Sequence, residues 1–71
     1  MLGWDDLRYF LTVGRTGSTL AAAKMLRVNQ TTVARRISGL EEATGLVLFE
    51  RRRAGYALTP AGAALVDQAE A

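Results

Sequence analysis

The fold of this chain is decided by residues 17–45, which read GSTLAAAKMLRVNQTTVARRISGLEEATG. The stretch opens with a helix predicted over residues 19–26, because its interior is rich in strong helix formers and Ser18 before it is a favourable N-cap. Small side chains let a neighbouring helix approach closely. The packing face of this helix is therefore expected to consist of Ala22, Ala23 and Leu26.

A second helix is predicted over residues 30–44, directly after a short turn. Asn29 is a good N-cap, Val28 before it can pack the turn onto the core, and Gly45 is typical of the residue that follows a helix. The spacing i, i+4, i+7 gives a buried face of Val33, Ile37 and Leu40. Two helices joined by a short turn, with polar and basic residues outside, form a helix-turn-helix.

The residues before this motif predict one more helix, over 5–14. Its apolar stripe consists of Leu7, Phe10, Leu11 and Gly14. Asp5 or Asp6 is expected to cap its start, and Trp4 is expected to pack against the domain. Gly14 and Gly17 bracket its expected end.

The residues after Gly45 predict a β-hairpin and then a last helix. The β-prone runs 47–49 and 56–58 are separated by a basic segment in which Gly55 takes a positive φ. A basic hairpin over 50–56, directly after a helix-turn-helix, is typical of a wing. Thr59 then caps a helix whose first residue is Pro60.

We therefore expect a mostly α fold with a small β-hairpin, that is, a three-helix core plus wing. Residues 1–58 are expected to form this winged helix-turn-helix domain, and residues 59–71 the start of a further helix. A chain of 71 residues has a marginal core, so association with a second chain is expected to supplement it.

Composition excludes several classes of function. The chain has no Cys and no His, which removes disulfides, thiolate zinc sites, the commonest metal ligand and the commonest general base. Glu41 and Glu42 point about 100° apart on a helix and so form no catalytic pair. We expect no catalysis and no cofactor. No apolar run approaches the roughly 20 residues that span a bilayer, and no basic secretory start is present, so we expect no membrane association.

The charge of the chain is unevenly distributed. Residues 24–53 hold seven basic and three acidic residues, a net charge of +4, whereas the rest carries −2. This basic excess is concentrated in the middle of the chain, over the helix-turn-helix and the wing, which favours double-stranded DNA as a partner. The alternative is a winged helix that contacts a protein. It predicts a neutral or apolar outer face on the 30–44 helix, which Arg35 and the basic wing contradict.

Residues near the start of the 30–44 helix are placed to enter the major groove. An amide pairs bidentately with adenine, and a guanidinium with guanine. The expected base-reading residues are Gln30, Thr31 and Arg35. Auxiliary or phosphate contacts are expected from Thr32, Ala34, Arg36, Ser38, Arg51, Arg52 and Arg53. Two alternatives stay open: Gln30 and the threonines as ordinary first-turn polar residues, and Arg36 as the partner of a carboxylate.

Many positions from Asp5 to Leu65 agree in order and spacing with one known family. The segments that carry the agreement include Leu7-Arg8-Tyr9-Phe10, Gly17-Ser18, Ala22-Ala23, Val28-Asn29-Gln30, Leu48-Phe49-Glu50-Arg51 and Leu58-Thr59-Pro60-Ala61-Gly62. The chain closely resembles the N-terminal DNA-binding domain of LysR-type transcriptional regulators. The resemblance implies a bacterial, cytoplasmic, nucleoid-associated transcription factor that binds DNA sequence-specifically. Gln30 and Arg35 stand on family positions that contact DNA.

The resemblance also implies a homodimer, or a tetramer in the full-length parent, formed through a long linker helix. A possible seam on that helix consists of Ala61, Ala64, Leu65 and Gln68. An effector-binding domain would follow, so a small-molecule effector is expected only for that absent part. The chain departs from the family pattern at Thr31 and Ala34, where proline and serine are common. It also carries an extra wing arginine, Arg52, expected to add phosphate affinity, and Thr19 at a commonly apolar position, where Leu20 is expected to take over the packing.

Overall fold

The computed structural model describes residues 3–70, so Met1, Leu2 and Ala71 at the ends of the two expected segments lie outside the described residues. Its elements follow in the order α1 (Trp4–Thr16), α2 (Thr19–Leu26), α3 (Gln30–Thr44), β1 (Phe49–Arg52), β2 (Gly55–Leu58) and α4 (Pro60–Glu70). This arrangement confirms the expected mostly helical fold with one antiparallel hairpin. The division into a domain over 1–58 and a further helix over 59–71 stays a prediction.

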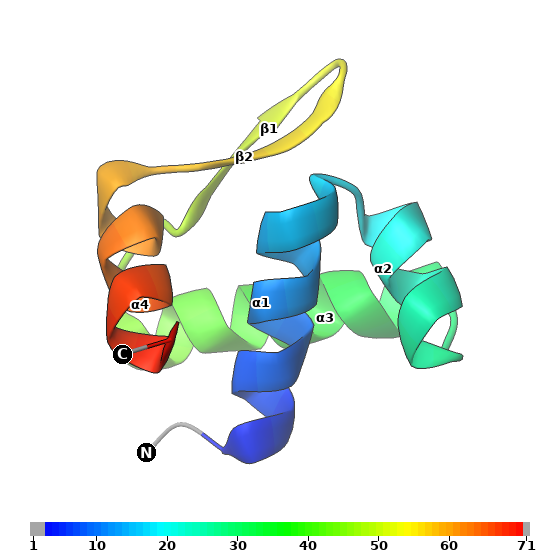
Figure 1. Cartoon of the computed structure of the whole chain (residues 1–71), viewed down its shortest axis with the longest axis horizontal. Coiled ribbons are helices and arrows are strands. Elements are labelled where there is room, and N and C mark those ends of the chain that lie inside the picture. The colour runs from blue at the N-terminus through cyan, green and yellow to red at the C-terminus, as the bar shows by residue number, and fades with distance from the viewer. Residues whose placement is uncertain (1–2, 71) are drawn as a thin grey trace.

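The first three helices enclose one core. α1 packs on both α2 and α3, and Figure 1 shows it lying across the long axis of α3. Phe10 of α1 and Phe49 of β1 pack with their rings tilted by 53° and their centroids 5.4 Å apart, which joins the core to the hairpin. The fully or largely buried apolar side chains are Tyr9, Phe10, Val13, Ala22, Ala23, Val33, Ile37, Leu40, Leu48 and Phe49.

The helix-turn-helix has the local geometry that the sequence predicts. The Ser18 hydroxyl accepts from the backbone N–H of Ala21 at 3.1 Å, and Asn29 Oδ1 accepts from that of Thr32 at 2.9 Å. Both N-cap predictions are confirmed. The turn between the helices is tight because Arg27 ends α2 in the left-handed conformation, with φ 59°.

The structure corrects the bounds and part of the buried face predicted for the first helix, although Phe10 is fully buried as predicted. α1 begins at Trp4 and is capped by the backbone of Gly3, so Asp5 and Asp6 lie in the first turn and neither caps it. Its buried residues are Tyr9, Phe10, Thr12 and Val13, whereas Leu7 and Leu11 are only half-buried. The face shifts because α1 must contact α2 and α3 together. Trp4 is 71% exposed, so its expected packing role was also wrong.

The hairpin is longer and its turn shorter than predicted. β1 and β2 pair from Phe49↔Leu58 to Arg52↔Gly55, which leaves only residues 53 and 54 in the turn. The strand thus begins at Phe49 and includes two of the wing arginines. Gly55 has φ +138°, and a Cβ there would collide with the carbonyl oxygen of Gly17. That carbonyl accepts from Tyr56 N at 2.9 Å and fixes the hairpin to the α1–α2 turn.

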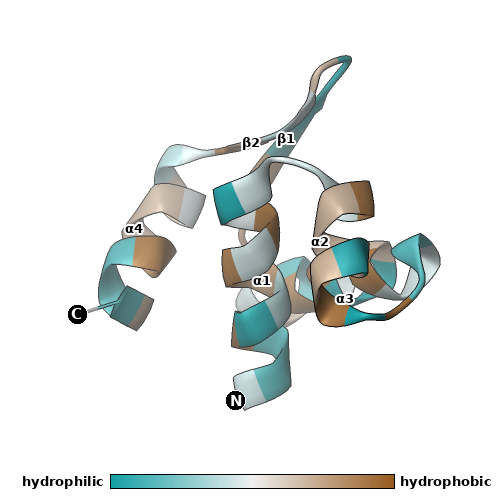
Figure 2. Cartoon of the chain, turned by 45° about the vertical axis from the view of Figure 1, so that its right-hand side comes forward, coloured by the Kyte–Doolittle hydropathy of each residue, from teal (hydrophilic) through white to brown (hydrophobic). Residues whose placement is uncertain are grey.

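The last helix closes the side of the core beside the hairpin. Thr59 Oγ1 accepts from Gly62 N at 3.0 Å, which confirms the predicted cap with Pro60 as first residue. Leu65 and Val66 pack against the core from α4. The apolar colouring in Figure 2 alternates with polar stretches along α1 and α4. Among residues 3–70, no helix is both long and apolar enough to cross a membrane.

Gly62→Ala should destabilise the domain by about 1–3 kcal/mol, because its Cβ would collide with the carbonyl oxygen of Leu48 and the backbone must shift. Urea unfolding followed by circular dichroism measures the change. Gly39→Ala is the matched control: it lies in α3 with nothing within 4 Å of the added Cβ, so it should stabilise by about 0.5–1 kcal/mol. Equal effects from the two variants would contradict the close approach of α4 to residue 48.

Candidate nucleic-acid interface

The polar face of α3 is free to meet a partner. Gln30, Thr31, Arg35 and Ser38 are exposed and Ala34 is half-buried, while Val33, Ile37 and Leu40 lie in the core. The structure therefore places the three predicted base-reading residues on one outward face of one helix. An α-helix with such an exposed polar face can enter a major groove.

Gln30 is held by the preceding helix. Its Nε2 donates to Thr19 Oγ1 at 2.9 Å, across the turn of the helix-turn-helix. The expectation that Leu20 would take over the packing of Thr19 is wrong, because Thr19 is buried at 7% exposure and Leu20 is 50% exposed. The first residue of α2 faces α3, so its hydroxyl finds a partner there.

Two other predicted contact residues are engaged within the domain. The hydroxyl of Thr32 donates to Asn29 Oδ1 at 2.9 Å, so it serves the cap of α3. Arg36 donates to Asp6 Oδ1 at 3.3 Å, and its guanidinium lies 5.4 Å from the centroid of the Tyr9 ring. Arg36 was expected either to contact phosphate or to pair with a carboxylate, and the structure shows the pair with a carboxylate. Among residues 3–70, Arg35 forms no ion pair, so it is the free guanidinium of α3.

The three wing arginines point in different directions. Arg51 lies opposite Tyr56, 5.5 Å from its ring centroid, and donates to Ser38 Oγ of α3 at 3.4 Å. Arg52 lies on the other face of the strand and is paired with Glu50, its Nε donating at 3.1 Å. Arg53 is exposed in the turn. The pairing offsets one of the three charges, which reduces the phosphate affinity expected of Arg52.

Glu41 is an organising residue that sequence reasoning missed. Its Oε2 accepts from the backbone N–H of Leu48 at 2.8 Å and from that of Phe49 at 3.4 Å. These bonds attach the start of the wing to α3. Local sequence carries little signal for this role, because an isolated helical glutamate is usually solvated. The cue is its position eight residues before the buried start of β1.

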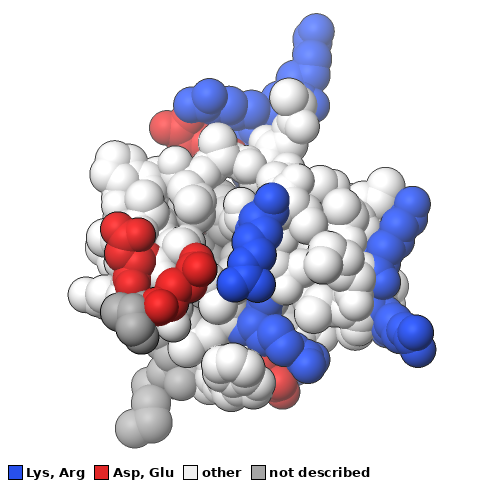
Figure 3. Space-filling model, in the orientation of Figure 1, with Lys and Arg blue, Asp and Glu red and all other residues white. Residues whose placement is uncertain are grey.

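Basic side chains are spread more widely over the surface than acidic ones. In Figure 3 basic side chains extend from the wing, from the side of α2 and across the middle of the face over α1, while acidic side chains lie over α4, beside the wing and at the lower edge. Ion pairs at the edges of this pattern join Arg15 to Glu70, 3.8 Å apart, and Arg36 to Asp6. The wing and the helix-turn-helix thus offer the positive surface that a polyanion requires.

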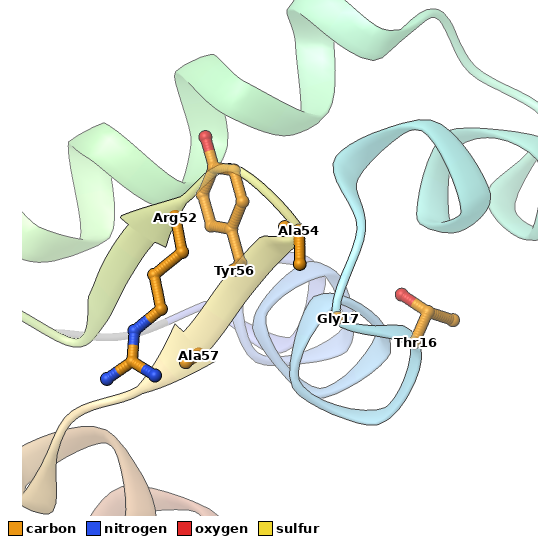
Figure 4. Close-up of a pocket in the computed structure, with 7 residues that line it drawn as sticks. Thr16, Gly17, Arg52, Ala54, Tyr56 and Ala57 are labelled. Carbon is orange, nitrogen blue, oxygen red and sulfur yellow. The ribbon is translucent and has the colours of Figure 1, made fainter.

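A hollow of about 310 Å³ lies between the α1–α2 turn and the hairpin (Figure 4). Figure 4 shows the Tyr56 ring pointing toward α3 and the Arg52 side chain pointing to the opposite face of the hairpin. Arg52, the charged residue of its lining, is already paired with Glu50. We therefore assign no ligand to this hollow.

The four residues of the predicted dimer seam differ in burial. Ala61 and Leu65 are half-buried and pack against the domain's own core, and their part in a seam stays a prediction. Ala64 and Gln68 are exposed. The sequence pattern could not distinguish the two pairs, because α4 turns one side of its apolar surface toward Leu58 and the core.

Residues 4–63 match the model of one family, described as bacterial regulatory helix-turn-helix protein, lysR family. The HTH-type transcriptional regulator TfdS of Cupriavidus pinatubonensis is 46% identical over 64 residues, covering 90% of this chain and 22% of that protein. The HTH-type transcriptional activator AllS of Klebsiella pneumoniae is 44% identical over 69 residues, covering 97% of this chain and 26% of that protein. The chain thus spans about a quarter or less of the length of these relatives.

Solved structures with the same fold include several complexes with DNA. The crystal structure of the CbnR_DBD-DNA complex superposes with a TM-score of 0.93 at 39% identity, covering 97% of this chain and 79% of that one. The BenM_DBD/catB site 1 DNA complex superposes with a TM-score of 0.91 at 34% identity, covering 96% of this chain and 76% of that one.

Glu41→Ala should lower the free energy of unfolding by about 1–3 kcal/mol, because it leaves the buried N–H of Leu48 without its acceptor. Glu42→Ala removes the same group from an exposed neighbouring position and should change stability by less than about 0.5 kcal/mol. Urea denaturation of both variants checks the difference. A Glu41 variant as stable as the Glu42 variant would contradict the attachment of the wing through this carboxylate.

Proposed function

Because this chain belongs to the lysR family of bacterial regulatory helix-turn-helix proteins, we propose that it is the sequence-specific DNA-binding domain of a transcriptional regulator. The observation that carries the proposal is the outward polar face of α3 beside a basic wing, in a fold whose relatives have been solved with DNA. The remainder of the parent protein would hold the effector-binding domain. We propose no catalytic role, and a cytoplasmic location.

The N-terminal half of α3 enters the major groove. Gln30 and Arg35 offer an amide and a free guanidinium to base edges, suited to adenine and guanine. Thr31 lies beside them with a hydroxyl for a base or phosphate and a methyl for thymine, and Ala34 adds an apolar contact. Thr32 takes part only through the cap that it completes with Asn29.

The wing and its neighbours hold the DNA backbone. Arg53 at the tip and Arg51 at the boundary with α3 approach the phosphates, and Ser38 fixes Arg51 through its hydroxyl. Arg52 contributes less because Glu50 accompanies it into the interface. Arg36 holds α3 on α1 through Asp6 and serves orientation.

The test is a titration of labelled random-sequence and selected duplex DNA at several salt concentrations, followed by fluorescence anisotropy. If about four phosphates are neutralised, the plot of log binding constant against log salt should have a slope of about −3.6. Arg35→Ala should weaken binding to the selected DNA by about 1–3 kcal/mol and relax the preference at one base pair, with little change in slope.

Arg15→Ala is the control, since it removes the same charge from a residue beside Glu70 of α4 and should leave the preference unchanged. A folded chain that binds neither duplex at low salt would contradict DNA binding. A partner bound with no salt dependence would favour the winged helix that contacts protein.

Two copies are proposed to associate through the exposed side of α4, so that each reads one half-site. Ala64 and Gln68 lie on that side, and a small residue allows two helices to approach closely. Sedimentation equilibrium at high micromolar concentration should give a mass above that of the monomer, and Ala64→Arg should return it to the monomer. A strict monomer in both cases would exclude a dimer of this chain.

A further inference from the structure

We propose that Thr19 is a specificity-determining positioning residue, whose buried hydroxyl holds the amide of Gln30 in one orientation for base reading. This inference rests on the proposed function and deepens it. It assigns part of the sequence preference to a residue of α2 that itself need not touch DNA.

The geometry places the two side chains at the junction of the two helices. Thr19 is the first residue of α2 and Gln30 the first residue of α3, and Gln30 Nε2 lies 2.9 Å from Thr19 Oγ1. Thr19 is 7% exposed, whereas Gln30 is exposed. The acceptor Thr19 is therefore fixed in the packed interior of the motif, and the donor Gln30 lies on the exposed face of α3 that is proposed to read bases.

The chemistry of the amide makes this anchor consequential. A glutamine amide has two N–H donors and one carbonyl oxygen. One N–H goes to Thr19, so the second N–H and the carbonyl oxygen remain for a partner. A bidentate contact with adenine uses one donor, to N7, and one acceptor, from N6. The bond to Thr19 therefore leaves the second N–H and the carbonyl oxygen of Gln30 available for this contact.

The anchor also lowers the entropy lost on binding. A free glutamine side chain must give up several rotamers when it settles on a base, and ordering such a side chain costs affinity. Gln30 is already ordered by Thr19 in the free protein. Preference at the base pair read by Gln30 should therefore fall by about three- to tenfold when the anchor is removed, with no change at other positions.

The chain offers a matched control in its other buried threonine. Thr12 of α1 is 8% exposed, and its hydroxyl donates to the carbonyl oxygen of Arg8 at 2.8 Å, with no bond to α3. Thr12→Val and Thr19→Val make the same chemical change at nearly the same burial. Thr19→Ser retains the hydroxyl and so is the conservative variant that should restore function.

The experiment selects binding sites from a pool of random duplex DNA with the wild-type chain, Gln30→Ala, Thr19→Val, Thr19→Ser and Thr12→Val. Gln30→Ala identifies the base pair that Gln30 reads. Binding constants are then measured for the selected site and for the same site substituted at that base pair, with the slope against salt. Thermal unfolding by circular dichroism verifies that each variant is folded at the assay temperature.

The expected result is that Thr19→Val loses preference at that base pair alone, with the slope against salt unchanged, while Thr19→Ser and Thr12→Val retain it. Retained preference in folded Thr19→Val, or an equal loss in Thr12→Val, would overturn the positioning role. A Gln30→Ala variant with unaltered preference would overturn it too, while leaving DNA binding intact. No enrichment by the wild-type chain would overturn the proposed function itself.

Discussion

The backbone of Leu48 is the point on which the rest of the structure depends. Its N–H donates to Glu41 of α3, its carbonyl oxygen accepts from Thr59 N at 3.0 Å, and its side chain is fully buried. The same carbonyl lies so close to Gly62 that a side chain there would collide with it. One residue thus joins α3, the wing and α4. In so small a domain, such shared contacts compensate for a limited core.

This junction determines how the wing meets α3. Because β1 begins at Phe49, the two-residue alternation of a strand sends Arg51 toward α3 and Arg52 to the opposite face. Three consecutive arginines in sequence are therefore not one cluster of charge. One is fixed to Ser38 and Tyr56, one is paired with Glu50, and Arg53 is free at the tip. The direction of each guanidinium follows from strand register rather than from composition.

The reading surface depends equally on polar contacts beneath it. Gln30 and Arg36 belong to α3, but each is held by another helix, through Thr19 and through Asp6. Arg35 has no such ion pair among residues 3–70 and is exposed. The surface therefore combines residues with fixed orientation and a residue free to adjust. α2 thus supplies an anchor for the reading face as well as the small side chains that pack the motif.

The sequence by itself determined the features that depend on residues close together along the chain, namely helix starts and helix faces. Ser18, Asn29 and Thr59 predicted the starts of three helices, and spacing predicted the buried face of α3, because caps and helical periodicity act within a few residues. Composition alone excluded disulfides, thiolate zinc sites and histidine as a metal ligand or general base, because the chain has no Cys and no His. The candidate reading face was predictable for the same reason as the buried one, since the two are opposite sides of one helix.

Only the tertiary structure decided the contacts between residues distant in sequence. The buried face of α1 and the exposure of Trp4 follow from how three helices pack together. The start of β1 follows from the acceptor that Glu41 offers, and the burial of Thr19 in place of Leu20 from the closeness of α3. The partners of Gln30 and Arg36 lie 11 and 30 residues away along the chain. Local patterns carry no record of such pairs, because packing of whole helices brings them within hydrogen-bonding distance.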